Sequence, residues 1–297
     1  MRNAVLLTCL ALAGLASGCF ERTLVITLNP DGSGKFVMDN IAAPMPDFST
    51  GPDAKAPDPK QLARKAVREL VDETKGVDAW ADVSSEVMDD GRIHVKATGY
   101  FPDVNKLEFQ GSSKSDVKWA KNASGGMTLE MLMDTKKEGP ASKPKPMTDE
   151  QVAEAVKKAK MQWQQAQPMM AAFVGKMKID TTYMLPGKLG QVEGFTKTDK
   201  GGVQIVMDGK KMLDAMDKVL ADDKMVAEMV KAGRDPVKDG PGEKAMLEAV
   251  FGKNVTALKA SVTGELKPQF DYKADMGKAK AAQEEMMKKF ADAPATK

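Results

Sequence analysis

The chain of 297 residues contains a single histidine and two cysteines, and both cysteines lie within its first nineteen residues. Beyond Cys19 the sequence therefore has no disulfide, no free thiol and no cysteine-based metal site. Aromatic residues are also scarce, at 5%. We expect the part after Cys19 to be held together by packing alone, and at about 280 residues it is long enough for one large hydrophobic core or two modest ones.

The common catalytic motifs are also absent. The sequence has no G-x-S-x-G elbow, no P-loop and no H-E-x-x-H helix. The single histidine, His94, falls on the polar face of a predicted strand, with no partner to make it a base or a ligand. The adjacent carboxylates Asp89–Asp90 and Asp222–Asp223 fit turns and helix ends better than the two opposed carboxylates of glycoside hydrolysis. We therefore predict a protein that is not an enzyme, with no catalytic residue, no cofactor and no metal site.

Long apolar runs are missing except at the start of the chain. Ala4–Ala16 is an apolar run of thirteen residues, which is shorter than the roughly 20 residues needed to span a bilayer. Arg2 precedes this run, and small residues follow it directly before Cys19. This order is typical of a secretory signal.

The run that ends at Cys19 resembles the lipobox of bacterial lipoproteins. The resemblance implies that residues 1–18 are a signal peptide and that Cys19 becomes the lipidated N-terminus, carrying acyl chains such as palmitate. Several acyl chains on one residue anchor a protein stably. We expect residues 19–297 to form an extracytoplasmic body on the cell envelope, and Phe20 implies the outer membrane if the source is Gram-negative. The alternatives are a secreted protein cleaved nearby and an uncleaved hydrophobic N-terminus.

Charge gives no argument for a nucleic-acid partner. Without residues 1–18 the chain has 43 basic and 42 acidic residues, whereas nucleic-acid binding needs a strongly basic face. Lys60, Arg64 and Arg68 repeat every four residues along a predicted helix and could touch anionic lipid headgroups. Glu69 and Asp72 dilute this charge, so a solvated face is favoured.

Methionine is frequent, with 22 residues. Methionine-rich stretches could bind copper(I) through their thioethers. The spacing favours core filling instead, because a flexible apolar side chain at strand or helix spacing packs well. The residues in question are the strand set Met127, Leu129, Met131 and Met133 and the helical pairs Met212/Met216 and Met225/Met229.

Apolar periodicity predicts the secondary structure. The predicted strands are Glu21–Leu28, Lys35–Asp39, Ala81–Met88, Ile93–Phe101, Asp116–Lys121, Met127–Asp134, Ile179–Leu185, Val203–Met207 and Thr256–Thr263. The first predicted helix runs from Pro59 to Gly76. The second begins at the Thr148/Gln151 capping box and has a kink or a new turn at Pro168, after which Met170, Phe173 and Met177 continue its apolar face. The others run from Lys210 to Ala232 with a division near Asp222–Asp223, from Glu243 to Phe251 and from Met276 to Phe290. Together they predict an α+β fold, in which several amphipathic helices pack on an antiparallel meandering sheet.

Four segments without periodicity complete the prediction. Asn29–Gly34 has the spacing of the start of an EF-hand loop, but Asn40 at the twelfth position and the flanking strands favour a hairpin turn. Ala42–Pro59 reads as an exposed loop, and residues 136–148 are a possible internal connector rich in proline and lysine. The tail 291–297 is predicted to be disordered. Because strands recur on both sides of the connector, we expect one continuous body.

Three features together resemble the LppM-like lipoproteins. They are the lipid-bearing Cys19 that leads directly into a strand, the Asn29–Gly34 hairpin, and a strand ending in Leu185-Pro186-Gly187 before another at Val203–Met207. The resemblance implies an α+β body with an open sheet and a role in binding lipids or glycolipids. It transfers no binding residue to this chain.

Two functions follow from these observations. The first is a non-catalytic binding module for a hydrophobic or lipid-like envelope ligand, tethered to the membrane by its acyl anchor. The second is a structural or assembly lipoprotein that docks to other envelope proteins. A binding module needs an apolar pocket of hundreds of Å³, whereas a scaffold needs an exposed apolar patch.

Overall fold

The computed structural model describes residues 20–43, 58–109, 116–132, 147–237 and 257–291. Several predictions lie outside these residues and stay predictions. They are the signal peptide 1–18 and the lipidation of Cys19, the loop residues 44–57, residues 136–146 of the connector, the helix Glu243–Phe251 and the tail residues 292–297.

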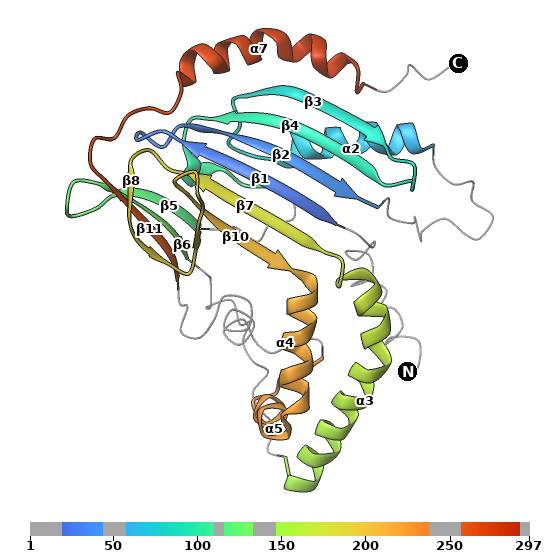
Figure 1. Cartoon of the computed structure of the whole chain (residues 1–297). Helices are drawn as coiled ribbons and strands as arrows, with labels where there is room; N and C mark the ends of the chain where they lie inside the picture. The colour runs from blue at the N-terminus through green and yellow to red at the C-terminus, as the bar shows by residue number, and fades with distance from the viewer. Residues whose placement is uncertain (1–19, 44–57, 110–115, 133–146, 238–256, 292–297) are drawn as a thin grey trace. The chain divides into compact units, whose positions relative to one another are not determined.

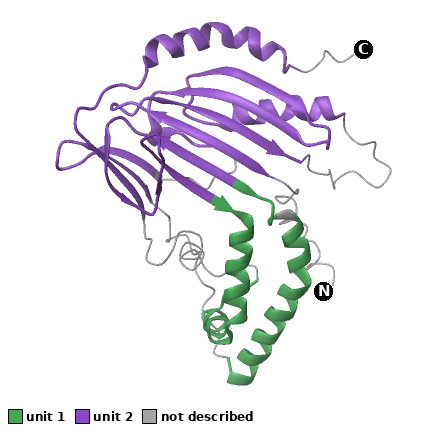
Figure 2. Ribbon diagram, in the orientation of Figure 1, with its two compact units in different colours: residues 1–18, 133–178, 207–256 green, residues 19–132, 179–206, 257–297 purple. Residues whose placement is uncertain are grey.

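The chain divides into two compact units (Figure 2). The sheet unit comprises residues 19–132, 179–206 and 257–297, and the helical unit comprises residues 1–18, 133–178 and 207–256. The chain passes between the units more than once, so no single point in the sequence separates them. The expectation of one continuous body stays a prediction.

The sheet unit confirms the predicted α+β class, with two mostly antiparallel sheets (Figure 1). The seven-stranded sheet has the order β3-β4-β2-β1-β7-β10-β9. Its strands are β1 (Glu21–Leu28), β2 (Gly34–Ala42), β3 (Ala79–Val87), β4 (Ile93–Phe101), β7 (Lys178–Met184), β9 (Thr196–Lys197) and β10 (Gly202–Asp208). The four-stranded sheet consists, in order, of β5 (Asp116–Lys121), β6 (Met127–Leu132), β11 (Ala257–Thr263) and β8 (Lys188–Glu193). The sequence did not predict β8 or β9.

The buried face of the larger sheet is built by phenylalanine rings that lie over glycines. Phe36 in β2 is paired with Gly99 in β4, and Gly34 is paired with Phe101. A Cβ atom on Gly99 would lie 2.3 Å from the Phe36 ring, and one on Gly34 would lie 2.4 Å from the Phe101 ring. Phe36 and Phe101 are fully buried and stack at 6.4 Å. The glycines are therefore required because the rings occupy the space of a side chain.

Two helices cover β3 and β4. The helix α2 (Pro59–Glu73) is capped by Asp58, whose side chain accepts a hydrogen bond from the Lys60 N–H at 3.0 Å, as predicted. The helix α7 (Tyr272–Lys288) begins four residues before the predicted Met276, because Asp271 provides an N-cap that the sequence analysis missed. Both pack against β3, and Figure 1 draws them on opposite sides of it. The short 3-10 helix η1 (Val104–Lys106) follows β4.

The Asn29–Gly34 turn is a hairpin turn, as predicted, and it also fastens the segment before α7. The Asn29 side chain is buried, and its Oδ1 accepts a hydrogen bond from the Gln269 N–H at 2.8 Å. The Gln269 side chain donates in turn to the carbonyl oxygens of Leu28 and Met184, both at 2.9 Å. The hydrogen bonds of Asn29 therefore explain the sequence of this turn without a calcium ion.

The helical unit contains α3 (Asp149–Phe173), α4 (Gly209–Ala221) and α5 (Asp223–Lys231). The predicted capping box at Thr148 and Gln151 is present, and the predicted division of 210–232 into two helices is confirmed. The predicted stripe Val152, Val156, Ala159 and Trp163 is buried against Leu213, Leu220, Val226 and Val230 of α4 and α5.

Pro168 does not end the helix. Proline removes one backbone hydrogen bond and normally kinks or breaks a helix, yet α3 runs through Pro168 to Phe173. Beyond the proline, Met170 and Val174 pack against the same hydrophobic cluster. Tertiary packing of these residues offsets the lost hydrogen bond.

Candidate functional site

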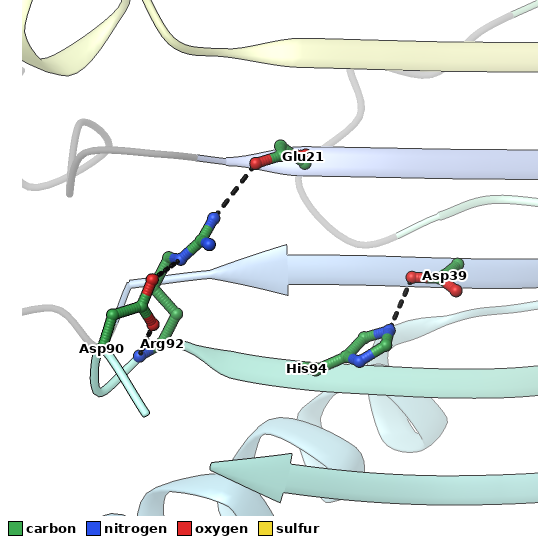
Figure 3. Close-up of polar contacts among 5 residues, drawn as sticks. All are labelled: Glu21, Asp39, Asp90, Arg92 and His94. Carbon is green, nitrogen blue, oxygen red and sulfur yellow. Dashed lines mark hydrogen bonds and ion pairs between the residues drawn. The ribbon is translucent and has the colours of Figure 1, made fainter. Parts of the chain in front are cut away.

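A histidine on the outer face of the larger sheet, His94, lies between two carboxylates. Figure 3 shows its contact with one of them, Asp39. In β4, His94 is paired with Glu86 in β3 and with Ile41 in β2. Its Nδ1 lies 2.8 Å from Oε1 of Glu86, and its Nε2 lies 2.7 Å from Oδ1 of Asp39. The prediction that His94 has no partner was therefore wrong. We call Asp39, Glu86 and His94 the histidine cluster.

The chemistry of the histidine cluster follows from these two contacts. A neutral imidazole has one donor nitrogen, so His94 donates to both carboxylates only as the imidazolium. In this arrangement neither ring nitrogen is free to take a proton from a substrate. The Nζ atom of Lys96 lies 3.7 Å from Oδ2 of Asp39 and brings a positive charge to the same carboxylate. Glu86 remains 70% exposed, so its ion pair adds little to stability.

Register explains why this cluster escaped the sequence analysis. Glu86 and His94 belong to one predicted hairpin, but counting outward from Met88 and Ile93 pairs His94 with Val87, one residue away from its partner Glu86. Asp39 lies 55 residues from His94. Its approach depends on β2 lying beside β4, which no local pattern indicates.

The two carboxylate pairs that the sequence singled out are structural. Asp90 lies in the β3–β4 turn, where Arg92 donates to it from the backbone N–H at 3.1 Å and from Nε at 2.6 Å. These bonds lower the pKa of Asp90 below its usual value. Arg92 also binds Oε1 of Glu21 at 3.0 Å (Figure 3).

The second carboxylate pair lies in the helical unit. Asp222 caps α5 by accepting hydrogen bonds from the backbone N–H groups of Lys224 and Met225. Asp223 forms an ion pair with Lys160. Neither pair provides two opposed carboxylates.

A groove of about 580 Å³ lies between α3 and α5 within the helical unit. We call it the α3–α5 groove. This volume is in the range of roughly 300–1,000 Å³ that is usual for small-molecule sites. Its apolar lining consists of Val152, Ala153, Val156, Met161 and Ala227.

Charged side chains surround this apolar lining. Lys157, Lys160, Asp149 and Asp223 border the α3–α5 groove. Lys160 is held by Asp223 and donates to the Ala221 carbonyl oxygen at 3.2 Å. Asp149 lies 3.8 Å from Lys231. The groove therefore combines an apolar floor with a polar rim, as amphiphile sites do.

The methionines divide between core and surface. Met127 and Met229 are buried, which fits the predicted core role. Met161 is 49% exposed and Met225 is 38% exposed, so part of the methionine complement of the helical unit faces outward. Within the described ranges, no group of three or more His, Cys, Asp and Glu side chains is placed to hold a metal ion.

Among the described residues, none of the helices combines the length and apolar character needed to cross a bilayer.

Comparison with known proteins adds little. No protein-family profile and no curated protein sequence matches the chain. The solved folded domain of the Mycobacterium tuberculosis LppM protein is similar over 66% of this chain and 85% of that domain, with 12% sequence identity and a TM-score of 0.31. At this TM-score the similarity assigns neither a fold family nor a function.

Proposed function

We propose that the chain is a lipid-anchored protein of the bacterial cell envelope whose folded part binds a hydrophobic or lipid-like ligand without catalysis. Cys19 is the proposed lipidation site, and the protein lies on the extracytoplasmic side of the membrane, at the outer membrane in a Gram-negative cell. The observation that carries the binding role is the α3–α5 groove.

The lining of the groove supports an apolar ligand. Val152 and Val156 are buried core residues that form its floor, while Met161 is half exposed at its edge. Methionine has a flexible, polarisable side chain that adapts to irregular apolar shapes. A ligand placed in this groove gains apolar contact while its polar end meets the rim.

The state of the titratable groups supports a role without catalysis. Both nitrogens of His94 contact carboxylates, and Asp90, Asp222 and Asp223 each have a structural partner. General acid–base work needs a group that can exchange a proton with a substrate within hydrogen-bond reach. Of the carboxylates that border the α3–α5 groove, Asp223 forms an ion pair with Lys160, and Oδ1 of Asp149 lies 3.8 Å from Nζ of Lys231.

Native mass spectrometry tests the proposal. Residues 20–297, produced in a bacterial host, are expected to carry a discrete extra mass that organic extraction releases as a lipid. Ala153→Trp places a large ring in the groove at an exposed lining position, and we expect it to remove the extra mass. Ala172→Trp makes the same change at an exposed position of α3 outside the lining and should keep it. A clean sequence mass for the unmodified protein would contradict the binding role.

The anchor has its own test. The full chain expressed in bacteria should incorporate radiolabelled palmitate and fractionate with membranes, and Cys19→Ala should abolish both. Incorporation that survives Cys19→Ala would contradict the assignment of Cys19.

The exposed methionines favour a second candidate, an assembly lipoprotein that docks to other envelope proteins. Met147, Met161, Met169 and Met225 of the helical unit are each at least 38% exposed. Crosslinking from these positions in intact cells would trap a defined protein neighbour if this surface is a docking site.

A further inference from the structure

Arg22 is a buried cation in the first strand of the protein. It alternates with Leu24 and Ile26, which are buried, so its side chain lies on the core face of β1. Its Nε atom is buried and has no hydrogen-bond partner. Burial lowers the pKa of its guanidinium. The Nε–H of Arg22 is thus desolvated without a hydrogen bond, which is unfavourable for a charged group.

Arg92, the other arginine of the same sheet, has the carboxylate partners that Arg22 lacks. Arg92 contacts the carboxylates of Asp90 and Glu21, and these raise its pKa. Around Arg22 the recorded contact is aromatic instead, because its guanidinium carbon lies 4.9 Å from the centroid of the Phe20 ring. A ring over one face of a guanidinium leaves the N–H groups at its edge available for an oxyanion.

A second buried polar atom without a partner lies directly across the ladder. Asn40 is paired with Arg22, and its Oδ1 is also buried without a hydrogen bond. The oxygen and nitrogen of an asparagine amide are assigned from their hydrogen bonds. Rotating the amide by half a turn presents an N–H₂ donor beside the Arg22 Nε–H. The two residues then offer adjacent donors, which is the arrangement that binds an anion.

The position in the chain identifies the kind of anion. Arg22 follows Cys19 by three residues, a span of at most about 11 Å of extended chain. If Cys19 carries acyl chains, Arg22 is held at the level of the lipid headgroups, where phosphate is the abundant anion. Guanidinium binds phosphate through two parallel N–H···O bonds.

We propose that Arg22 and Asn40 form a binding site for a phosphate group, supplied by a membrane lipid headgroup beside the acylated N-terminus. The lipid source rests on the proposed anchoring at Cys19, whereas the phosphate chemistry does not. A phosphate in this site neutralises the buried guanidinium and orients the start of β1 at the membrane.

The site is tested by NMR of the arginine side chains in the full chain, purified from bacterial membranes in a neutral detergent and labelled with ¹⁵N-arginine. The sequence has six arginines, of which five remain when residues 1–18 are removed, so the Nε–Hε signals can be assigned by substitution. Inorganic phosphate should shift the Arg22 signal and slow its exchange with water, while the same concentration of chloride should not. Phospholipid nanodiscs should reproduce the shift without added phosphate.

Substitutions separate the site from general charge effects. Arg22→Lys keeps the charge but loses the planar donor pair, and we expect phosphate affinity to fall about tenfold. Arg64→Gln removes an arginine of α2 and should leave the Arg22 response unchanged. Asn40→Asp places a carboxylate opposite Arg22, and the internal ion pair should abolish the response to phosphate.

Each outcome has a clear meaning. A shift with nanodiscs supports the headgroup as the source, and a shift with inorganic phosphate alone supports the phosphate site but overturns the headgroup. An Arg22 signal that responds to neither, or equally to chloride, overturns the proposal. If palmitate incorporation fails while the phosphate response persists, the anchor is wrong and the site stands.

Discussion

The sheet unit and the helical unit have cores of different chemistry. The sheet unit packs Phe36 against Phe101 and Trp80, and its glycines admit the rings. The helical unit packs small aliphatic side chains around one aromatic residue, Trp163. Close-packed rings fit together in a single arrangement. The valine, alanine and methionine side chains of the helical unit leave space for the α3–α5 groove, and flexible methionines adapt to ligands of different shape. We therefore place rigidity in the sheet unit and adaptability in the helical unit.

The largest expected effect comes from the glycine under the Phe36 ring. Gly99→Ala puts a methyl group within 2.3 Å of that ring, and such overpacking costs about 2–3 kcal/mol. Chemical denaturation should show this loss, and hydrogen exchange should show it first in β1, β2 and β4.

The control is a glycine in the same unit with free space around it. Gly277 in α7 has no atom within 4 Å of an added Cβ, so Gly277→Ala should stabilise the helix by about 0.5–1 kcal/mol. Equal effects at both glycines would show that the sheet core yields to the extra methyl group, and the contrast in rigidity would fail.

A smaller effect is expected at Asp217, whose side chain forms hydrogen bonds between α4 and α3 in the helical unit. Asp217 accepts hydrogen bonds from the Trp163 indole N–H at 2.6 Å and from the Gln167 amide at 3.0 Å. Asp217→Ala leaves both donors unpaired, and we expect a loss of about 2 kcal/mol. Tryptophan fluorescence during denaturation reports the change.

Asp214→Ala is the matched control, because it removes an exposed carboxylate on the same helix. Its ion pair with Lys210, four residues away, is worth about 0.3–0.5 kcal/mol. If the two variants were equally stable, the Asp217 bonds would not hold the helical core.

The smallest effect is electrostatic and lies in the sheet unit. Hydrogen bonds from Arg92 lower the pKa of Asp90, so the contribution of this carboxylate to stability is present above its unfolded pKa and is lost as the pH falls through the folded pKa. Arg92→Gln keeps the hydrogen bond from the backbone N–H and removes the one from Nε, so the pKa of Asp90 should rise part of the way toward its ordinary value. A carboxyl ¹³C titration measures the pKa, and an unchanged value would contradict the contribution of the arginine side chain.

Local patterns predicted most of the elements. The strand Glu21–Leu28, the N-cap Asp58, the capping box at Thr148 and the break at Asp222 all appear where periodicity and capping chemistry placed them. These features depend on residues a few positions apart, which is the range that a sequence pattern records.

The misses share one physical cause. The environment of His94 depends on Asp39 in another hairpin. Strand β8 was missed as well, since it pairs with β11, about 70 residues further along the chain. Each depends on contacts between segments that lie far apart in sequence.

The sequence by itself determined the type and rough position of most helices and strands, because apolar spacing and capping residues act over single turns. It also predicts that Cys19 follows a signal peptide. Because residues 1–19 lie outside the described part of the chain, this stays a prediction. Only the tertiary structure decided which strands are neighbours, and thus that His94 meets two carboxylates and that Arg22 lies on the core face without one. It also decided that α3 and α5 border an open groove. Burial and charge pairing are properties of neighbours in space, and strand order is set by the packing of the whole chain.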